Sequence, residues 1–132
     1  MLVLPVLILF LYVMVEGMFI LRTWIILEHA SNVGARYAAV GNTASAVTTC
    51  TVNESGSILS SSNVTVSGAQ GTVGNPVTVS VSYTYTYESP LLTIVKSVTG
   101  TTIPNTVTMT PQTQMRLESQ SAPISTQCGG SS

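Results

Sequence analysis

The sequence predicts an α+β fold, in which a long N-terminal hydrophobic helix carries a small antiparallel β-sheet head. Three observations predict it. Residues 1–23 are almost wholly apolar, with Glu16 as the only charged side chain before Arg22. The helical pattern then continues through residues 24–40 without a glycine-proline break. Beyond residue 48, valine and tyrosine alternate with serine and threonine, which is the period-two pattern of half-buried strands.

The helix is expected to hold roughly 40 residues and to be ~60 Å long. Its apolar part is long enough to cross a bilayer, which takes ~20 residues. Pro5 falls in the first turn, where its missing N–H costs little. Gly41 and Asn42 are a suitable stop. We therefore divide the chain into an N-terminal helix, residues 1–45, and a β-rich globular head, residues 46–132.

Four or five antiparallel strands are expected in the head. They are placed at residues 48–53, 63–67, 76–88 and 106–118, the last broken at Pro111. Residues 91–98 are apolar, and the pattern there leaves open a strand or a short helix. An extension of the long helix by one turn through residues 44–47 also stays open.

The strand at residues 76–88 has strict alternation, so its two faces differ in polarity. Its valines and tyrosines are expected to cover the C-terminal half of the long helix, while its threonines and serines face solvent. A patch of small residues on the helix, beginning at Gly34, allows close approach. The residues expected to pack the helix on the head are Gly34, Arg36, Tyr37, Val79, Val81 and Tyr83.

Composition argues against several classes of function. The net charge is −1 with only four lysines and arginines, so a nucleic-acid-binding surface is not expected. One histidine, no aspartate and no closely spaced pair of carboxylates make an enzyme the weakest option. His29, Cys50 and Cys128 lack the spacing of metal ligands, and no cofactor is expected. A subunit contact is the expected role of His29.

Two cysteines and two asparagines are candidates for covalent modification. In an exported chain, Cys50 and Cys128 are most simply one disulfide, and two buried free thiols are the alternative. Asn53 and Asn63 each begin a sequon for N-glycosylation. Such tripeptides also arise by chance in Ser/Thr-rich sequence, so both interpretations stay open.

Several motifs resemble the TadE-like family of tight-adherence (Flp-type) pilus proteins, which are relatives of type IV pilins. The sequence LVLP at residues 2–5, the pair Glu16-Gly17, and NVGARYAAV at residues 32–40 stand where the family has similar elements. The alternating strand at residues 77–85, the apolar segment at 91–100 and MRLE at 115–118 also fit. The resemblance therefore spans nearly the whole chain, and it is most specific in the helix.

This resemblance implies a pilin-like, lollipop-shaped subunit of an extracellular filament that serves surface adhesion. The partners it implies are other copies of the chain, the inner membrane before assembly, a prepilin-type peptidase and the pilus assembly machinery. A surface receptor or glycan is a further expected partner. One alternative is a minor pseudopilin that primes or caps a pilus. Another is a single-pass anchored surface domain that binds a ligand and never polymerises.

Glu16 lies in the middle of the apolar segment and is expected to have a functional role, because an ionised carboxylate in hydrocarbon is costly unless paired. The early glutamate typical of type IV pilins is not seen beside the LVLP run, and Glu16 is a candidate for its role. It is expected to meet the Met1 amine or Arg22 of a neighbouring subunit, or else to stay protonated and hydrogen-bonded. The expected polymerisation core is Met1, Pro5, Glu16, Gly17, Arg22 and Trp24.

Overall fold

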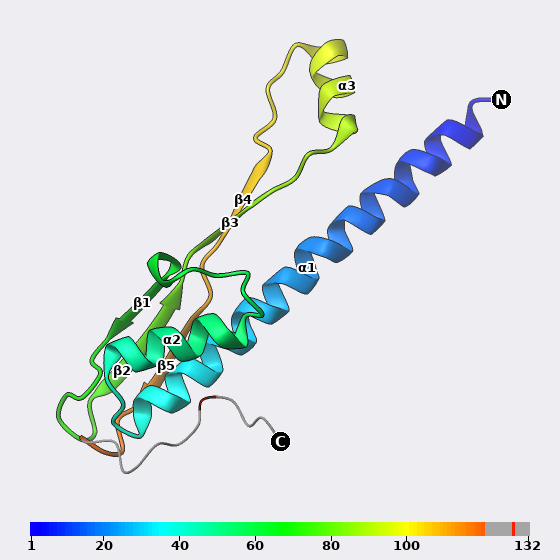
Figure 1. Ribbon diagram of the computed structural model, residues 1–132. Coiled ribbons are helices and arrows are strands. Elements are labelled where there is room, and N and C mark those ends of the chain that lie inside the picture. Colours follow the sequence, from blue (N-terminus) through cyan, green and yellow to red (C-terminus); the bar gives the residue numbers. More distant parts are fainter. Residues whose placement is uncertain (121–127, 129–132) are drawn as a thin grey trace.

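The computed structural model describes residues 1–120 and 128, and one helix dominates it (Figure 1). Helix α1 runs over Val3–Ala39, 37 residues, which corresponds to ~55 Å. It ends where Gly41, at φ 93°, donates its N–H to the carbonyl of Ala38 at 3.0 Å. The α+β class and the long helix are confirmed. The first 26 residues of the chain contain no buried side chain.

Helix α2, Ala44–Glu54, replaces the strand expected at residues 48–53. The hydroxyl of Thr43 caps its first turn by accepting from the N–H of Ala46 at 3.2 Å. Inside the helix, the hydroxyls of Thr48 and Thr51 donate to carbonyls four residues earlier. The expectation was wrong because it weighed the β-propensity of threonine and valine, whereas a buried helical stripe decides the structure. That stripe is Val47, Cys50 and Thr51.

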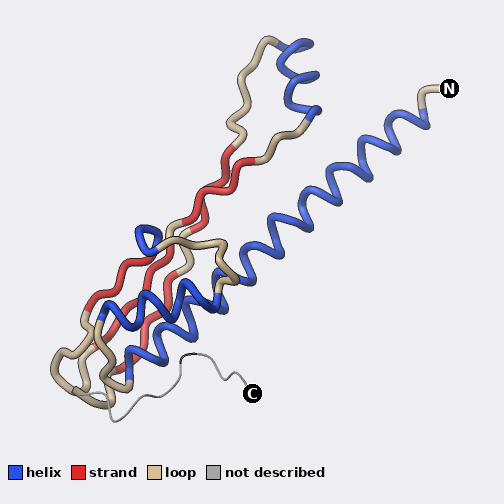
Figure 2. The backbone as a smooth tube through the Cα atoms, viewed as in Figure 1, coloured by secondary structure: helices blue, strands red, loops and turns tan. Residues whose placement is uncertain are grey.

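The two helices pack closely because small residues face α2. Gly34 and Ala35 of α1 are buried, and a Cβ added to Gly34 would collide with the Thr51 hydroxyl. Only glycine therefore fits at this point of the interface. Figure 2 shows α1 and α2 as neighbouring helices at the lower end of the molecule, beside the strands.

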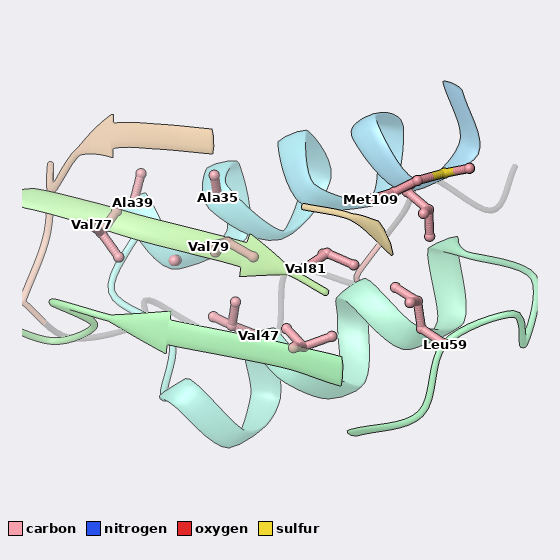
Figure 3. Close-up of a cluster of buried hydrophobic side chains, with 11 residues drawn as sticks. Ala35, Ala39, Val47, Leu59, Val77, Val79, Val81 and Met109 are labelled. Atoms are coloured by element: carbon pink, nitrogen blue, oxygen red, sulfur yellow. The ribbon is translucent and has the colours of Figure 1, made fainter. Parts of the chain in front are cut away.

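A three-stranded antiparallel sheet packs against these helices. Its order is β1-β2-β5, and the strands are Val64–Ser67, Pro76–Val81 and Gln112–Arg116. The central strand β2 buries Val77, Val79 and Val81, which meet Ala35 and Ala39 of α1 and Val47 of α2 in the core (Figure 3). The core of the head is thus shared with α1 from Leu27 onward.

Polar contacts also fix α1 to the sheet. The hydroxyls of Ser31 and Thr113 lie 2.8 Å apart, between α1 and β5. The carbonyl of Ala39 at the end of α1 accepts from the N–H of Glu118 at 2.8 Å. That carbonyl has no partner within its own helix, so the segment after β5 completes the end of α1.

Beyond this sheet, two strands continue alone as a ribbon. Strand β3, Tyr83–Thr86, pairs with β4, Thr106–Met109. Tyr83 follows Ser80 by three positions, and their partners Met109 and Gln112 are also three positions apart, so the register of β2 with β5 is kept. The strand expected at residues 76–88 is therefore present as two strands, β2 and β3, with a break at Ser82. The N–H of Ser82 bonds to the carbonyl of Asn63 near β1. The partner segment, β4 and β5, is broken at Thr110 and Pro111, and a break at Pro111 was predicted.

A short helix sits at the tip of this ribbon (Figure 1). Helix α3, Pro90–Thr99, settles the open assignment of residues 91–98. Ser89 caps it by accepting from the N–H of Leu91 at 3.3 Å, Pro90 occupies the first turn, and Gly100 ends it at φ 68°. We call residues 83–109, comprising β3, α3 and β4, the arm.

Cys50 and Cys128 form a disulfide, with Cα atoms 5.3 Å apart and a sequence separation of 78. Cys50 is buried on α2, so the bond ties the C-terminal region to the helical hairpin. Closing a loop of this length contributes ~4 kcal/mol in the chain-entropy account.

The contact at Gly34 gives a matched test of the helix–helix packing. Gly34→Ala should lower the free energy of unfolding by about 1–3 kcal/mol, because the added methyl forces α1 and α2 apart. Gly17→Ala is the control, since nothing lies within 4 Å of an added Cβ there. Urea unfolding of the detergent-solubilised chain, followed by circular dichroism, measures both. Equal midpoints for the two variants would contradict the packing described.

Candidate functional site

The N-terminal half of α1 is an uncovered apolar surface. Among residues 1–120, α1 is the one helix that is long and apolar enough to cross a membrane, by length and composition. No part of its most apolar stretch of 18 residues is buried. Phe10 remains 59% exposed and Phe19 54% exposed. Soluble monomers rarely leave so large an apolar patch in water. This half of α1 therefore requires lipid or protein around it.

The residues expected to form a polymerisation core all lie on or beside this half. Pro5, Gly17, Arg22 and Trp24 are exposed on α1, and Met1 is exposed just before its start. Glu16 differs from them because it is half-buried. The structure thus leaves five of the six open to another molecule.

Glu16 lies beside the arm. It lines a hollow of about 240 Å³ together with Tyr12 and Phe19 of α1 and residues 85–88 of the arm. Glu88 is a second carboxylate on the same hollow. Tyr87 is fixed there, because its hydroxyl donates to the carbonyl of Pro104 at 2.7 Å. Within the described part of the chain, neither carboxylate forms an ion pair with a basic group.

Gly17 lies on a second and larger hollow between the same two elements. Its volume is about 400 Å³, and it is mostly apolar. Helix α1 contributes Gly17, Ile20, Leu21 and Trp24, and β4 contributes Val107, Thr108 and Met109. The sequence analysis did not assign the β4 residues to any site, although the alternation of apolar residues at 107 and 109 was a usable signal.

Five of the six residues expected to pack the helix on the head are buried or half-buried. Val79 and Val81 are buried, and Tyr37 and Tyr83 are half-buried against the same core. Arg36, in contrast, is exposed on α1. Position 36 is turned ~100° from position 35, away from the inward side that Ala35, Ala38 and Ala39 define.

The two sequon asparagines have different surroundings. Asn53 is exposed near the end of α2. Asn63 is half-buried, and its side-chain amide donates to the carbonyl of Ser82 at 2.9 Å, while its oxygen accepts from the Ser60 backbone at 3.1 Å. The nitrogen that would carry a glycan is therefore already bonded in Asn63, which makes Asn53 the better acceptor of the two.

Metal-ligating side chains are not gathered in residues 1–120 and 128. No group of three or more His, Cys, Asp or Glu residues there is placed to hold a metal ion. His29, for which a subunit contact was expected, lies 3.9 Å from Glu54 of α2 and is 65% exposed. This pair links α1 to α2 at the surface.

Comparison with known proteins finds a family match for the N-terminal region of the chain. Residues 1–36 match the family model described as TadE-like protein. Searches of curated proteins and of solved structures each found no significant match. The TadE-like resemblance is thereby confirmed for the N-terminal region, and it suggests a protein associated with a Tad pilus. The head lies outside the match, so its role has to be argued from its own geometry.

The environment of Asn63 gives a paired prediction. Asn63→Asp should destabilise the chain by about 1–3 kcal/mol, because it replaces the donor to Ser82 with an oxygen and leaves two acceptors facing each other. Asn53→Asp should change the free energy of unfolding little, since Asn53 is exposed. Thermal unfolding of both variants measures the difference. A larger loss from Asn53→Asp would show that the bonding pattern around Asn63 is not structural.

Proposed function

Starting from the TadE-like match over α1, we propose that this chain is a structural subunit of an extracellular Tad-type pilus, which polymerises through α1 and serves adhesion to surfaces. The observation that carries the proposal is the uncovered apolar half of α1. The segment is matched by a pilus-associated family and has no covering partner among residues 1–120 and 128. Copies of the same helix would supply that cover.

The apolar half of α1 has two suitable environments. Before assembly it spans the cytoplasmic membrane, which needs ~20 apolar residues. After assembly it lies against the α1 helices of other subunits. Burying ~1,000 Å² of apolar surface per subunit would contribute ~25 kcal/mol before the costs of association. Extraction from lipid into a filament is therefore feasible, because the apolar surface is never left in water.

The two expected regions of the chain have different roles in this proposal. Residues 1–45 provide the membrane span and later the filament core, and residues 46–132 provide the outer layer. The head has few charges, so copies that stack along a filament repel one another little. The family context adds a prepilin-type peptidase that trims the precursor and an assembly machinery that moves it out of the membrane.

Two alternatives predict different material on the cell surface. A minor pseudopilin would be present in fibres at a low ratio to another subunit, and an anchored binding domain would stay in the membrane fraction. Mass spectrometry and negative-stain imaging of sheared surface material separate the three. The proposal predicts uniform fibres in which this chain is the main component.

Glu16 provides the sharpest variant for this function. Glu16→Leu should reduce the yield of sheared fibres about tenfold, equivalent to a loss of roughly 1.4 kcal/mol, by removing a charge partner for a neighbouring subunit. Glu28→Leu is the control, since Glu28 is an exposed carboxylate of α1 that lines neither hollow. Immunoblots of membrane and sheared fractions report both amounts. An unchanged fibre yield for Glu16→Leu would contradict the proposal that Glu16 pairs with a charge on a neighbouring subunit.

A further inference from the structure

The ribbon of β3 and β4 leaves both of its long edges open. Beyond the three-stranded sheet the two strands run on alone (Figure 2). The N–H of Tyr87 donates to the carbonyl of Asn105 at 2.9 Å, across the ribbon. Antiparallel alternation then turns the backbone groups of every second residue outward, where no other described backbone group meets them. These residues are Thr84 and Thr86 on β3, and Thr106 and Thr108 on β4.

Neither strand of the ribbon carries a device that blocks a further strand. Exposed edge strands usually have a charged side chain, a proline or a bulge for that purpose. The sequences of β3 and β4, YTYT and TVTM, contain no charge and no proline. Strand β1 covers the edge of β2 only as far as the bond from the Ser82 N–H to the Asn63 carbonyl. Because a two-stranded ribbon is marginally stable alone in water, a further strand would stabilise the arm.

The ribbon lies over α1 with its edges turned to the two sides of the helix. Phe19 lines the hollow beside β3, and Leu21 lines the hollow beside β4. At ~100° per residue, these two side chains point to nearly opposite sides of α1. Ile20 lies between them and is half-buried against the core. The ribbon therefore covers α1 along the line of Ile20, and both edges remain accessible from the sides.

We propose that the arms of neighbouring copies join edge to edge, so that β3 of one subunit pairs with β4 of the next. This inference rests on the proposed function, because it names a second contact between the same subunits. Copies that polymerise through α1 all point the same way along a fibre. Since β3 and β4 of one chain are antiparallel, β3 of one copy is also antiparallel to β4 of the copy beside it. Such a contact repeats without closing, as a fibre requires.

The spacing of such ribbons agrees with the spacing of packed helices. Two strands occupy ~9.5 Å across a sheet, because neighbouring strands lie ~4.8 Å apart. Packed helices have axes about 8–10 Å apart. One ribbon over each α1 therefore repeats at nearly the same distance as α1 beside α1. The same pair of subunits can satisfy both contacts at once.

The two edges also match residue by residue. In copies at equal height, Thr84 lies level with Thr108 of the next copy, as it does within one ribbon. Both residues turn their backbone groups outward, so they meet as a hydrogen-bonded pair of an antiparallel ladder. A displacement of two residues, ~6.8 Å along the strand, keeps this match. Threonines then face threonines across the new contact, which favours pairing.

Cysteine pairs in two coexpressed copies test the pairing in fibres. One tagged copy carries Thr84→Cys or Thr86→Cys on β3, and a differently tagged copy carries Thr106→Cys or Thr108→Cys on β4. Sheared fibres are oxidised, and dimers are scored on non-reducing gels. At least one β3–β4 combination should join the two tags, because facing residues of paired strands are within disulfide reach. Two copies that both carry Thr84→Cys should give no dimer above background, since translated copies hold these residues too far apart.

A proline on the open edge gives a second test that leaves the ribbon itself intact. Thr86→Pro removes an outward N–H that bonds to no described backbone group of its own chain. Fibre yield should fall about tenfold, the order expected for one lost hydrogen bond at each contact. Thr86→Val is the matched control, because it keeps the N–H. Both variants should unfold at the same urea midpoint as detergent-solubilised monomers.

The outcomes separate this pairing from the function on which it rests. Normal fibres that give no β3–β4 dimers, and that tolerate Thr86→Pro as well as Thr86→Val, overturn the pairing and leave the pilus function intact. Dimers through β3 and β4 in the membranes of cells that never make fibres support the pairing and contradict polymerisation. The absence of both fibres and dimers overturns both proposals.

Discussion

The uncovered apolar half of α1 is the constraint on which the rest of this structure depends. A helix that exposes some twenty apolar residues cannot remain in water, since soluble proteins tolerate only small apolar patches. The C-terminal half of the same helix is fixed in the head by Leu27, Ala35 and Ala38. One rigid element therefore connects a folded domain to a surface that must find lipid or other copies. Any function of the chain therefore has to include a cover of lipid or protein for that apolar surface.

The head is organised to hold α1 tightly and to reach along it. Small side chains bring α2 close at Gly34, and the valines of β2 cover the neighbouring side. The β2–β5 ribbon then continues in unchanged register past the end of the three-stranded sheet, which projects the arm beside Glu16 and Gly17. The head therefore extends along α1 beyond its own core.

Sequence reasoning was most successful where periodicity was strong. The long helix, β1, the alternating faces at residues 76–88, the break at Pro111 and the disulfide partners are all present. It failed at α2, where Thr48 and Thr49 satisfy their hydroxyls on the helix backbone and a buried stripe outweighs β-propensity. The side of α1 on which Arg36 lies was not predictable, because it depends on which alanines face inward. The two hollows between α1 and the arm could not be predicted from the sequence, because the register that carries the arm past the sheet is a tertiary property.

Cryo-electron microscopy of fibres sheared from the cell surface tests the central claim most directly. The account predicts fibres in which residues 3–23 of α1 lie at the axis, in contact with α1 of other copies and free of lipid, with the heads outside. Fibres that lack this helix at their core would contradict it, as would recovery of the chain only as a membrane-embedded monomer.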